Sequence, residues 1–171
     1  MGICFAYDES NNALNVTTNV TLNINSNCET CPKGWTKYGR YCYRASAFTV
    51  TFDDGLKYCN GIGASVATIN SDKENLFFIT TFGTSWVNAI RMQETKVFVK
   101  FEKCYYLSCL AYTKWGPNQP SNNGTNLNCV VFCVDNSGNW CATSCEDKYK
   151  IICKISCSGM NTNLEIFHDK L

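Results

Sequence analysis

The chain has 171 residues, 45% of them hydrophobic, and a formal net charge of +1. This length and composition predict one domain with a single core, flanked by tails. Lysine and arginine form no run, which argues against nucleic acid as a partner, and no continuous apolar stretch has membrane-spanning length, so we expect no membrane span in this chain.

Thirteen cysteines are the most unusual feature of the composition. Because a reducing cytosol would leave so many thiols open to oxidation, we expect disulfide bonds and a protein that is secreted or lies on the extracellular side of the cell surface. Three glycosylation sequons fit this route, at Asn15, Asn19 and Asn123. The segment Met1–Asp8 has no signal-peptide pattern, so we expect the leader to be missing or replaced upstream.

The two ends of the chain differ in composition from the middle. Residues 9–27 are rich in Asn, Thr and Ser, so residues 1–27 are predicted to form a stalk or linker that can carry glycans. An alternation of apolar residues over Val16–Ile24 leaves open an edge strand instead. Residues 158–171 show no interpretable pattern and form a predicted tail, which leaves residues 28–157 as the domain.

Two helices are predicted near the start of the domain. Thr51 is the expected N-cap of the first, which ends at Gly61. The capping box Ser71-Asp72-Lys73-Glu74 begins the second, which ends before Gly83. The side chains expected to face the core are Phe52, Leu56 and Cys59 on the first helix and Leu76, Ile79 and Phe82 on the second.

The remainder of the domain is rich in β-forming residues. Asp135-Asn136-Ser137-Gly138 is a hairpin-turn signal between two expected strands. A pair of helices followed by strands is typical of the α+β class, and no internal repeat is present. The expected strands cover Tyr41–Ala45, Ser85–Ile90, Val97–Phe101, Asn128–Val134, Asn139–Thr143 and Lys150–Ile155, with a short apolar run at Ala64–Ile69.

The neighbours of the cysteines favour cross-links over metal binding or catalysis. Zinc sites use paired C-x2-C units or histidines, and this chain has one such unit, Cys28–Cys31, and one histidine, His168 in the tail. A nucleophile needs a base to take its proton, and a single tail histidine disfavours a histidine-based triad. The sequence therefore predicts a non-enzymatic protein without a cofactor.

The order of cysteines, tryptophans and prolines is the strongest signal in the chain. The order is Cys31-Pro-Lys-Gly-Trp35, Cys42, Cys59, Trp115, Gln119-Pro120-Ser121, Cys129, Trp140, Cys145 and Cys153. It resembles the C-type lectin-like domain, an extracellular recognition module held by two or three disulfides, over residues 31–154. Asn88, within Ser85–Ala89, stands where this family usually has the glycine of a Trp-Ile-Gly-Leu core segment.

The resemblance implies three disulfides, namely Cys31–Cys42, Cys59–Cys153 and Cys129–Cys145. Sequence spacing suggests three more local or terminal pairs, namely Cys104–Cys109, Cys133–Cys141 and Cys28–Cys157. The sequence leaves open an alternative in which Cys129 pairs with Cys141 and Cys133 with Cys145. Cys4 is then the odd cysteine, which either links two chains as a dimer or forms no bridge.

The resemblance also implies where a calcium ion would bind. Sugar-binding members hold it with a Glu-Pro-Asn or Gln-Pro-Asp tripeptide, a Glu two residues before the cysteine at Cys129, and an Asn-Asp pair after the tryptophan at Trp140. The corresponding residues of this chain are Gln119, Pro120, Ser121, Leu127, Cys141 and Ala142. Calcium takes about six to eight oxygen ligands, normally with several carboxylates, so calcium is disfavoured here.

We therefore predict an extracellular recognition module of C-type lectin type without the usual calcium site. Its partner is a secreted or cell-surface glycan or protein, bound by the long loop Cys104–Cys129 and the outer face of the hairpin Cys133–Cys141. The alternatives are a calcium-dependent galactose-type lectin that uses the Gln-Pro-Ser loop, and a structural domain that contacts ice or mineral through a flat polar face. The candidate ligand-binding residues are Tyr112, Gln119, Pro120, Ser121, Asn122 and Asn126.

Overall fold

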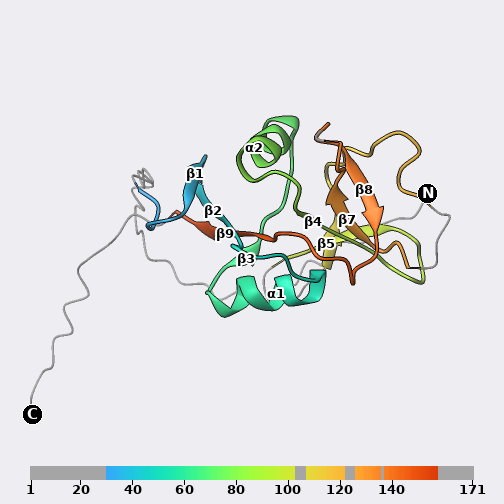
Figure 1. Cartoon of the computed structure of the whole chain (residues 1–171), viewed down its shortest axis with the longest axis horizontal. Coiled ribbons are helices and arrows are strands. Elements are labelled where there is room, and N and C mark those ends of the chain that lie inside the picture. The colour runs from blue at the N-terminus through green and yellow to red at the C-terminus, as the bar shows by residue number, and fades with distance from the viewer. Residues whose placement is uncertain (1–29, 103–106, 122–125, 136, 158–171) are drawn as a thin grey trace, which may run out of the picture.

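Two antiparallel sheets and two helices make up the described part of this computed structural model, which comprises residues 30–102, 107–121, 126–135 and 137–157 (Figure 1). The four-stranded sheet has the order β1 (Thr36–Tyr38), β2 (Tyr41–Ala45), β9 (Ile152–Ser156) and β3 (Ser65–Val66). The five-stranded sheet has the order β6 (Leu107–Cys109), β5 (Phe98–Phe101), β4 (Trp86–Arg91), β7 (Cys129–Phe132) and β8 (Trp140–Thr143). The predicted α+β class is confirmed.

The pairing of β2 with β9 joins the two ends of the described domain. Tyr41 lies opposite Ser156, and the N–H group of Cys157 donates to the carbonyl of Arg40 at 3.0 Å. β1 pairs with the other side of β2 and completes this end of the molecule. In Figure 1, β1 and β2 lie at one end and β7 and β8 at the other. The start and the finish of the described domain are therefore neighbours, on the far side from β8.

Helix α1 (Phe52–Gly61) begins and ends where the sequence predicts. The hydroxyl of Thr51 accepts a hydrogen bond from the N–H group of Asp54 at 3.3 Å, which satisfies one of the unpaired donors of the first turn. The predicted inward residues of α1, which are Phe52, Leu56 and Cys59, are all buried.

Helix α2 (Asp72–Phe82) begins at the predicted cap with one difference in its hydrogen bonds. The hydroxyl of Ser71 accepts from the N–H group of Glu74 at 3.2 Å, as the capping box predicts. The Glu74 carboxylate accepts from the N–H group of Asn70 at 2.7 Å, one residue earlier than a standard capping box requires. Figure 1 shows α1 and α2 on opposite sides of the strands between them.

The inward face of α2 differs from the prediction. Leu76 was expected to face the core, but it is 62% exposed, so that prediction is wrong. Asn75 and Phe78 are buried in its place, while Ile79 and Phe82 pack half-buried against the core. The helix turns this way because the core contains a polar donor that needs the Asn75 amide, as described below.

Most strands lie within the segments predicted for them. The run 64–69 contains β3, the predicted strand Tyr41–Ala45 is β2, and β4, β5, β7, β8 and β9 coincide with the remaining predicted strands to within two residues. The sequence did not predict β1 or β6, because each has three residues and neither includes a fully buried side chain. The possible strand at Val16–Ile24 and the tail 158–171 lie outside the described residues.

Strand β7 supplies side chains to both halves of the core. Val130 and Phe132 pack in a cluster with Trp140 on the α2 side, whereas Cys129 and Val131 pack in a second cluster on the α1 side. All four residues of β7 are buried, which explains why this strand is a continuous apolar run without alternation. The core thus extends through the five-stranded sheet on both of its faces.

Four disulfides cross the described domain, and they are the pairs expected from the resemblance and the spacing. The bridges are Cys31–Cys42, Cys59–Cys153, Cys129–Cys145 and Cys133–Cys141. The alternative pairing of Cys129 with Cys141 and Cys133 with Cys145 does not form. Cys109 and Cys157 are also disulfide-bonded. Their expected partners, Cys104 and Cys28, lie outside the described residues, as does Cys4.

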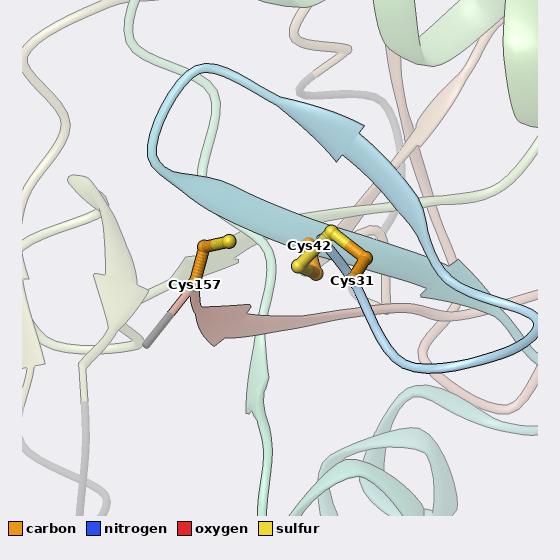
Figure 2. A group of neighbouring side chains, drawn as sticks. All are labelled: Cys31, Cys42 and Cys157. Carbon is orange, nitrogen blue, oxygen red and sulfur yellow. A yellow bond between two sulfur atoms is a disulfide. The ribbon is translucent and has the colours of Figure 1, made fainter. Parts of the chain in front are cut away.

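Three sulfur atoms gather where the two ends of the domain meet. The sulfurs of Cys31, Cys42 and Cys157 lie within 4.8 Å of one another, a spacing that a metal ion could bridge (Figure 2). However, Cys31 and Cys42 are bonded to each other, and Cys157 is in a disulfide as well. Metal ligation needs thiolates, so this cluster is a set of cross-links.

Removing the longest of the four bridges should cost the most stability. Replacing Cys59 and Cys153 together by alanine is expected to lower the free energy of unfolding by about 4 kcal/mol, because this bridge restricts the unfolded chain over 94 residues. The matched double replacement of Cys133 and Cys141, 8 residues apart, is expected to cost about 2 kcal/mol. Urea unfolding of both variants tests this order, and equal losses would contradict it.

Candidate functional site

The long loop is fastened to β8 by main-chain hydrogen bonds to one tryptophan. The N–H group of Trp140 donates to the carbonyl of Lys114 at 2.7 Å, and the N–H group of Gly116 donates to the carbonyl of Trp140 at 3.0 Å. Between them, the ring of Trp115 packs against the rings of Trp140 and Phe98, with centroid separations of 6.0 and 4.8 Å. Residues 114–116 therefore extend the five-stranded sheet beyond β8.

A buried hydrogen-bond chain supports this attachment from the core. The indole N–H of Trp140 donates to Oδ1 of Asn75 at 2.8 Å, and Nδ2 of Asn75 donates to the carbonyl of Gly138 at 2.7 Å. All three residues are buried, and an unpaired polar group there would cost about 1–3 kcal/mol. Asn75 thus fixes α2 relative to the hairpin that carries Gly138.

Gln119 holds the next turn of the loop through its side-chain oxygen. Oε1 of Gln119 accepts hydrogen bonds from the backbone N–H groups of Ser121 at 3.1 Å and Ala142 at 3.0 Å. Because Ala142 belongs to β8, this amide connects the loop to the sheet. The peptide bond between Gln119 and Pro120 is cis. Both lone pairs of the oxygen that would face a calcium ion are therefore engaged by N–H donors.

An arginine lies against the same turn of the loop. Arg91, the last residue of β4, donates from Nη2 to the carbonyl of Ser121 at 2.9 Å, and its guanidinium lies 4.8 Å from the centre of the Phe98 ring. A guanidinium is always charged in proteins and repels a second cation nearby. The sequence reasoning missed Arg91, because a basic residue that ends an apolar strand does not reveal which distant loop it will contact.

The positions that the resemblance assigns to calcium ligands hold a poor set of donors. Cys141 is bonded to Cys133, and the side chains of Ala142 and Leu127 are aliphatic. The carbonyl oxygen of Gln119 is engaged as described above. Calcium requires about six to eight oxygen ligands, usually including carboxylates. These side chains supply no carboxylate and do not meet that requirement.

Asp72 connects the start of α2 to the beginning of the long loop. Its Oδ1 accepts hydrogen bonds from Nζ of Lys114 at 2.6 Å and from the hydroxyl of Tyr112 at 2.9 Å. The contact with Lys114, followed by that with Tyr112, lowers the pKa of Asp72. Burial, and then the neighbouring Asp72, raises the pKa of Tyr112. Near neutral pH the carboxylate stays ionised and the phenol stays protonated, so neither is poised to exchange a proton.

The structure brings together part of the predicted ligand-binding set. Gln119, Pro120 and Ser121 form one half-buried turn, and Asn126 is exposed. Tyr112 donates to Asp72 and belongs to the α2 side of the loop. The sequence pointed to neither Asp72 nor Asn75 in this region, because their partners lie more than 30 residues away along the chain. The predicted sites outside the described residues are Asn122 and the sequons Asn15, Asn19 and Asn123.

Comparison with known proteins gives consistent matches in sequence. A family model described as "Lectin C-type domain" matches residues 48–155. The chain is 31% identical over 139 residues to Lectin BRA-3 of Megabalanus rosa, covering 76% of this chain and 82% of that protein. It is 29% identical over 153 residues to CD209 antigen-like protein A of Mus musculus, covering 85% of this chain and 62% of that protein. The chain thus spans less than two thirds of the mouse protein.

Solved structures match over most of the domain. Human lithostathine aligns with a TM-score of 0.67 at 20% identity, covering 81% of this chain and 99% of that one. A calcium-independent type II antifreeze protein aligns with a TM-score of 0.65 at 23% identity, covering 74% and 95%. Identities this low show a shared fold and nothing about the ligand.

The ion pair at Asp72 can be tested by titration. Lys114→Gln is expected to raise the pKa of Asp72 toward its ordinary value of about 3.9, since the strongest contact that lowers it is removed. In the unmodified protein, the contact contributes stability above that ordinary pKa and loses it as the pH falls through the lowered pKa. NMR titration of the carboxyl carbon measures both values.

The control is Asp54, whose pKa is lowered by Thr51 and Lys57 on α1. It should titrate identically in the unmodified protein and in Lys114→Gln. An Asp72 pKa that does not change in the variant would contradict the assigned contact.

Proposed function

Since this chain belongs to the C-type lectin domain family, we propose that it is a recognition module that binds a glycan or protein ligand through its long loop without a calcium ion. It works outside the cell and is not an enzyme. The surface that binds the ligand comprises the loop from Tyr112 to Asn126 and the outer face of the Cys133–Cys141 hairpin. The observation that carries the proposal is the engagement of Gln119 by two backbone donors.

The hydrogen bonds of Gln119 support a loop that needs no ion to keep its shape. In sugar-binding relatives, as the resemblance implies, an ion joins the loop tripeptide to the residues after the tryptophan. Here the Gln119 oxygen joins the same two segments directly, because one of its donors is the backbone of Ala142. A divalent cation would have to displace both N–H donors from this oxygen, and the partly buried N–H groups would lose that acceptor.

The cation on Arg91 supports the same conclusion on electrostatic grounds. Its guanidinium lies within hydrogen-bonding distance of the turn at Ser121 and brings a permanent positive charge to the loop. Cys141 and Ala142, in place of the family's Asn-Asp pair, add no negative charge that would offset it. Both features lower the affinity of this loop for calcium.

A rigid loop is suited to recognition. Main-chain bonds to Trp140, the Gln119 amide and the Asp72 ion pair each fix a different point of the segment 112–121. Because a preorganised loop loses less conformational entropy on binding, more of the contact energy appears as affinity. Loops carried on a cross-linked scaffold are also where binding residues concentrate in general.

The disulfides support the extracellular location and the family supports the absence of catalysis. Four described bridges require an oxidising compartment for their formation. Members of this family are generally binding modules, and the ionisable pair Asp72 and Tyr112 is not tuned for proton transfer. Among the described residues, no helix combines the length and apolarity that a bilayer crossing requires.

The second candidate is a calcium-dependent galactose-type lectin. Gln119-Pro120-Ser121 differs from the Gln-Pro-Asp tripeptide at one position, which is the observation in its favour. This function would require the Gln119 oxygen to turn away from Ser121 and Ala142 and toward an ion. The two candidates therefore differ in what calcium does to the loop.

Gln119→Ala is expected to lower the free energy of unfolding by about 1–3 kcal/mol, because two N–H groups lose their acceptor. Thr113→Ala, at an exposed position of the same loop, is the control and should change stability by less than about 0.5 kcal/mol. Chemical denaturation, once with a chelator and once with calcium, measures both variants. A loss confined to calcium-containing buffer would favour the second candidate.

Calcium is expected to leave the melting temperature of the oxidised protein unchanged. An intact site at about 100 times its Kd would add about 2.7 kcal/mol to the free energy of unfolding, which a thermal melt detects easily. Melts with millimolar calcium and with chelator give the comparison. A calcium-dependent rise would contradict the proposed function.

Binding of a glycan or protein ligand is also expected to be unaffected by a chelator. The oxidised protein is screened against arrays of glycans and of extracellular protein domains, with and without calcium. Asn126→Lys should reduce the strongest signal at least about tenfold, because it places an extended charge on the exposed loop. Asn60→Lys, on the exposed side of α1, is the matched control and should have no effect. A signal that disappears with chelator, or that Asn60→Lys reduces equally, would contradict the proposal.

A further inference from the structure

Gly116 of the long loop packs directly against the disulfide between Cys133 and Cys141. Gly116 is buried, and a Cβ atom at this position would lie 3.3 Å from Sγ of Cys133, closer than side chains normally pack. The loop main chain therefore leaves no free space beside the bridge. We propose that this bridge is a redox switch, which an extracellular dithiol opens and which thereby loosens the long loop. Its effect on ligand binding rests on the function proposed above.

Cys141 lies between the two residues of β8 that hold the loop. On one side, the carbonyl of Trp140 accepts a hydrogen bond from the N–H group of Gly116 at 3.0 Å. On the other side, the N–H group of Ala142 donates to Oε1 of Gln119 at 3.0 Å. A displacement of Cys141 therefore reaches the loop at two points, one through each neighbour.

The hairpin that carries the bridge is held on two opposite faces. On the α2 face, Asn75 is hydrogen-bonded to the indole of Trp140 and to the carbonyl of Gly138. Side chains alternate across a strand, so Cys141 points to the other face, where it packs against the α1-side core cluster and is bonded to Cys133. Opening the bridge therefore removes the constraint on one face and leaves the contacts of Asn75 on the other.

Accessibility distinguishes this bridge from the other three described bridges. Cys133 is 6% exposed and Cys141 is half-buried. In disulfide exchange one sulfur is attacked and the other leaves as a thiolate, whose charge is costly at a position without access to water. The Cys133–Cys141 bridge is therefore expected to open first among the four. Each of the other three includes at least one cysteine with no exposed surface, and these are Cys42, Cys59, Cys129 and Cys153.

The exchange consumes one dithiol and yields two protein thiols. A thiolate of the reductant attacks Sγ of Cys141, the bond to Cys133 breaks, and Cys133 leaves as a thiolate that takes a proton from water. The second thiol of the reductant loses its proton and displaces Cys141, which is protonated in turn. Two electrons pass to the protein, and the reductant becomes a cyclic disulfide. Because two thiols need more space than one disulfide and Gly116 leaves none beside Cys133, we expect the loop to shift.

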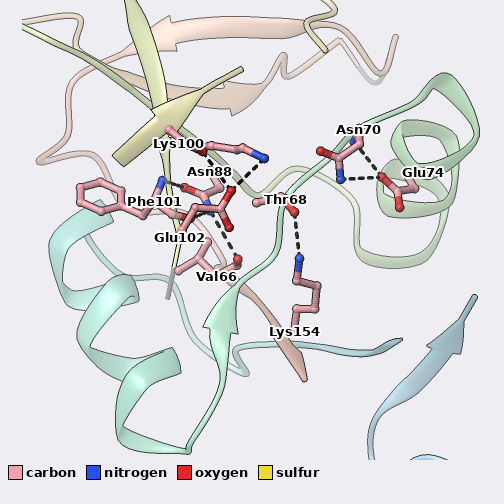
Figure 3. A network of polar contacts seen from close by, with 10 residues as sticks. Val66, Thr68, Asn70, Glu74, Asn88, Lys100, Phe101, Glu102 and Lys154 are labelled. Carbon is pink, nitrogen blue, oxygen red and sulfur yellow. Dashed lines mark hydrogen bonds and ion pairs between the residues drawn. The ribbon is translucent and has the colours of Figure 1, made fainter. Parts of the chain in front are cut away.

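The contacts that join the two sheets do not involve the bridge. Nδ2 of Asn88 donates to the carbonyls of Val66 at 3.3 Å and Phe101 at 2.9 Å, and its Oδ1 accepts from the N–H group of Phe101 at 2.9 Å (Figure 3). Asn88 thereby joins β3 to β4 and β5 from a buried position. The Cys133–Cys141 bridge also has the shortest sequence separation of the four, 8 residues, so its loss frees the unfolded chain the least. The domain should remain folded when this bridge alone is open.

Alkylation and hydrogen exchange together test the switch. Dithiothreitol, a small dithiol, is titrated into the oxidised protein, and differential alkylation with mass spectrometry identifies the cysteines that become free. Cys133 and Cys141 are expected to be alkylated first among the four described bridges. At that point the amides of Gly116 and Ala142 should exchange at least about tenfold faster, because their acceptors lie on the two segments that separate. The amide of Trp86, which donates to the carbonyl of Lys150 at 2.8 Å, should exchange at an unchanged rate.

Two double variants assign the effect to this bridge. Cys133→Ser combined with Cys141→Ser should show the fast exchange of Gly116 without dithiothreitol and no further change with it. Cys31→Ser combined with Cys42→Ser is the matched control, because it removes a bridge of similar sequence separation at the other end of the domain. The control should keep both the slow exchange and the response to dithiothreitol. A response that persists in the first variant would assign the release to another bridge and overturn the proposal.

The remaining outcomes separate the switch from the proposed function. The switch is overturned if another of the four bridges opens first, if the exchange of Gly116 and Ala142 does not change, or if Trp86 accelerates equally. The arrays of glycans and extracellular protein domains are screened with the unmodified protein and with the variant that lacks Cys133 and Cys141. The strongest signal should fall at least about tenfold in the variant, since a loosened loop loses its preorganisation, and an equal signal would overturn the control of binding. No signal with the unmodified protein would contradict the proposed function, while the exchange rates would still decide whether the bridge controls the loop.

Discussion

Trp140 is the residue on which the recognition end of this domain depends. Its main chain holds the long loop at Lys114 and Gly116, and its indole N–H ties the same point to Asn75 on α2. Three elements that are distant in sequence therefore share one anchor, which is buried on all sides. A domain whose binding loop is attached to its core in this way transmits little motion to the loop, because the core is closely packed.

In the function proposed above, protein atoms take over a structural task that the resemblance assigns to an ion in sugar-binding members. A bound ion holds its ligands only while its concentration exceeds its Kd, so an ion-held loop responds to the surrounding medium. The Gln119 amide and the Arg91 guanidinium belong to the chain, so under this proposal the loop needs no ion to form their contacts. Such a module would keep its affinity where calcium is scarce, and it would lose the ability to release its ligand when calcium falls.

The sequence predicted the helix caps and the disulfide pairs of the described domain. It did not predict features that depend on side chains distant in the sequence. Thr51 and Ser71 begin their helices as predicted, because a cap depends on residues within one turn. Leu76 was misassigned because the inward face of α2 is set by Asn75, whose partner Trp140 lies on another strand. The contact of Arg91 with the long loop was not predicted for the same reason, because its partner Ser121 lies 30 residues away along the chain. Such residues look ordinary in sequence, since their importance comes from partners that only the fold brings close.

The two ends of the described domain lie beside each other, at the end of the molecule away from β8 (Figure 1). The domain therefore has an attachment end and a recognition end. Tyr41 and Ser156 lie opposite each other in neighbouring strands. A tether, tag or solid support joined to either end would leave the long loop pointing outward and unobstructed. Protein immobilised through either end would thus keep its long loop accessible to a ligand in solution.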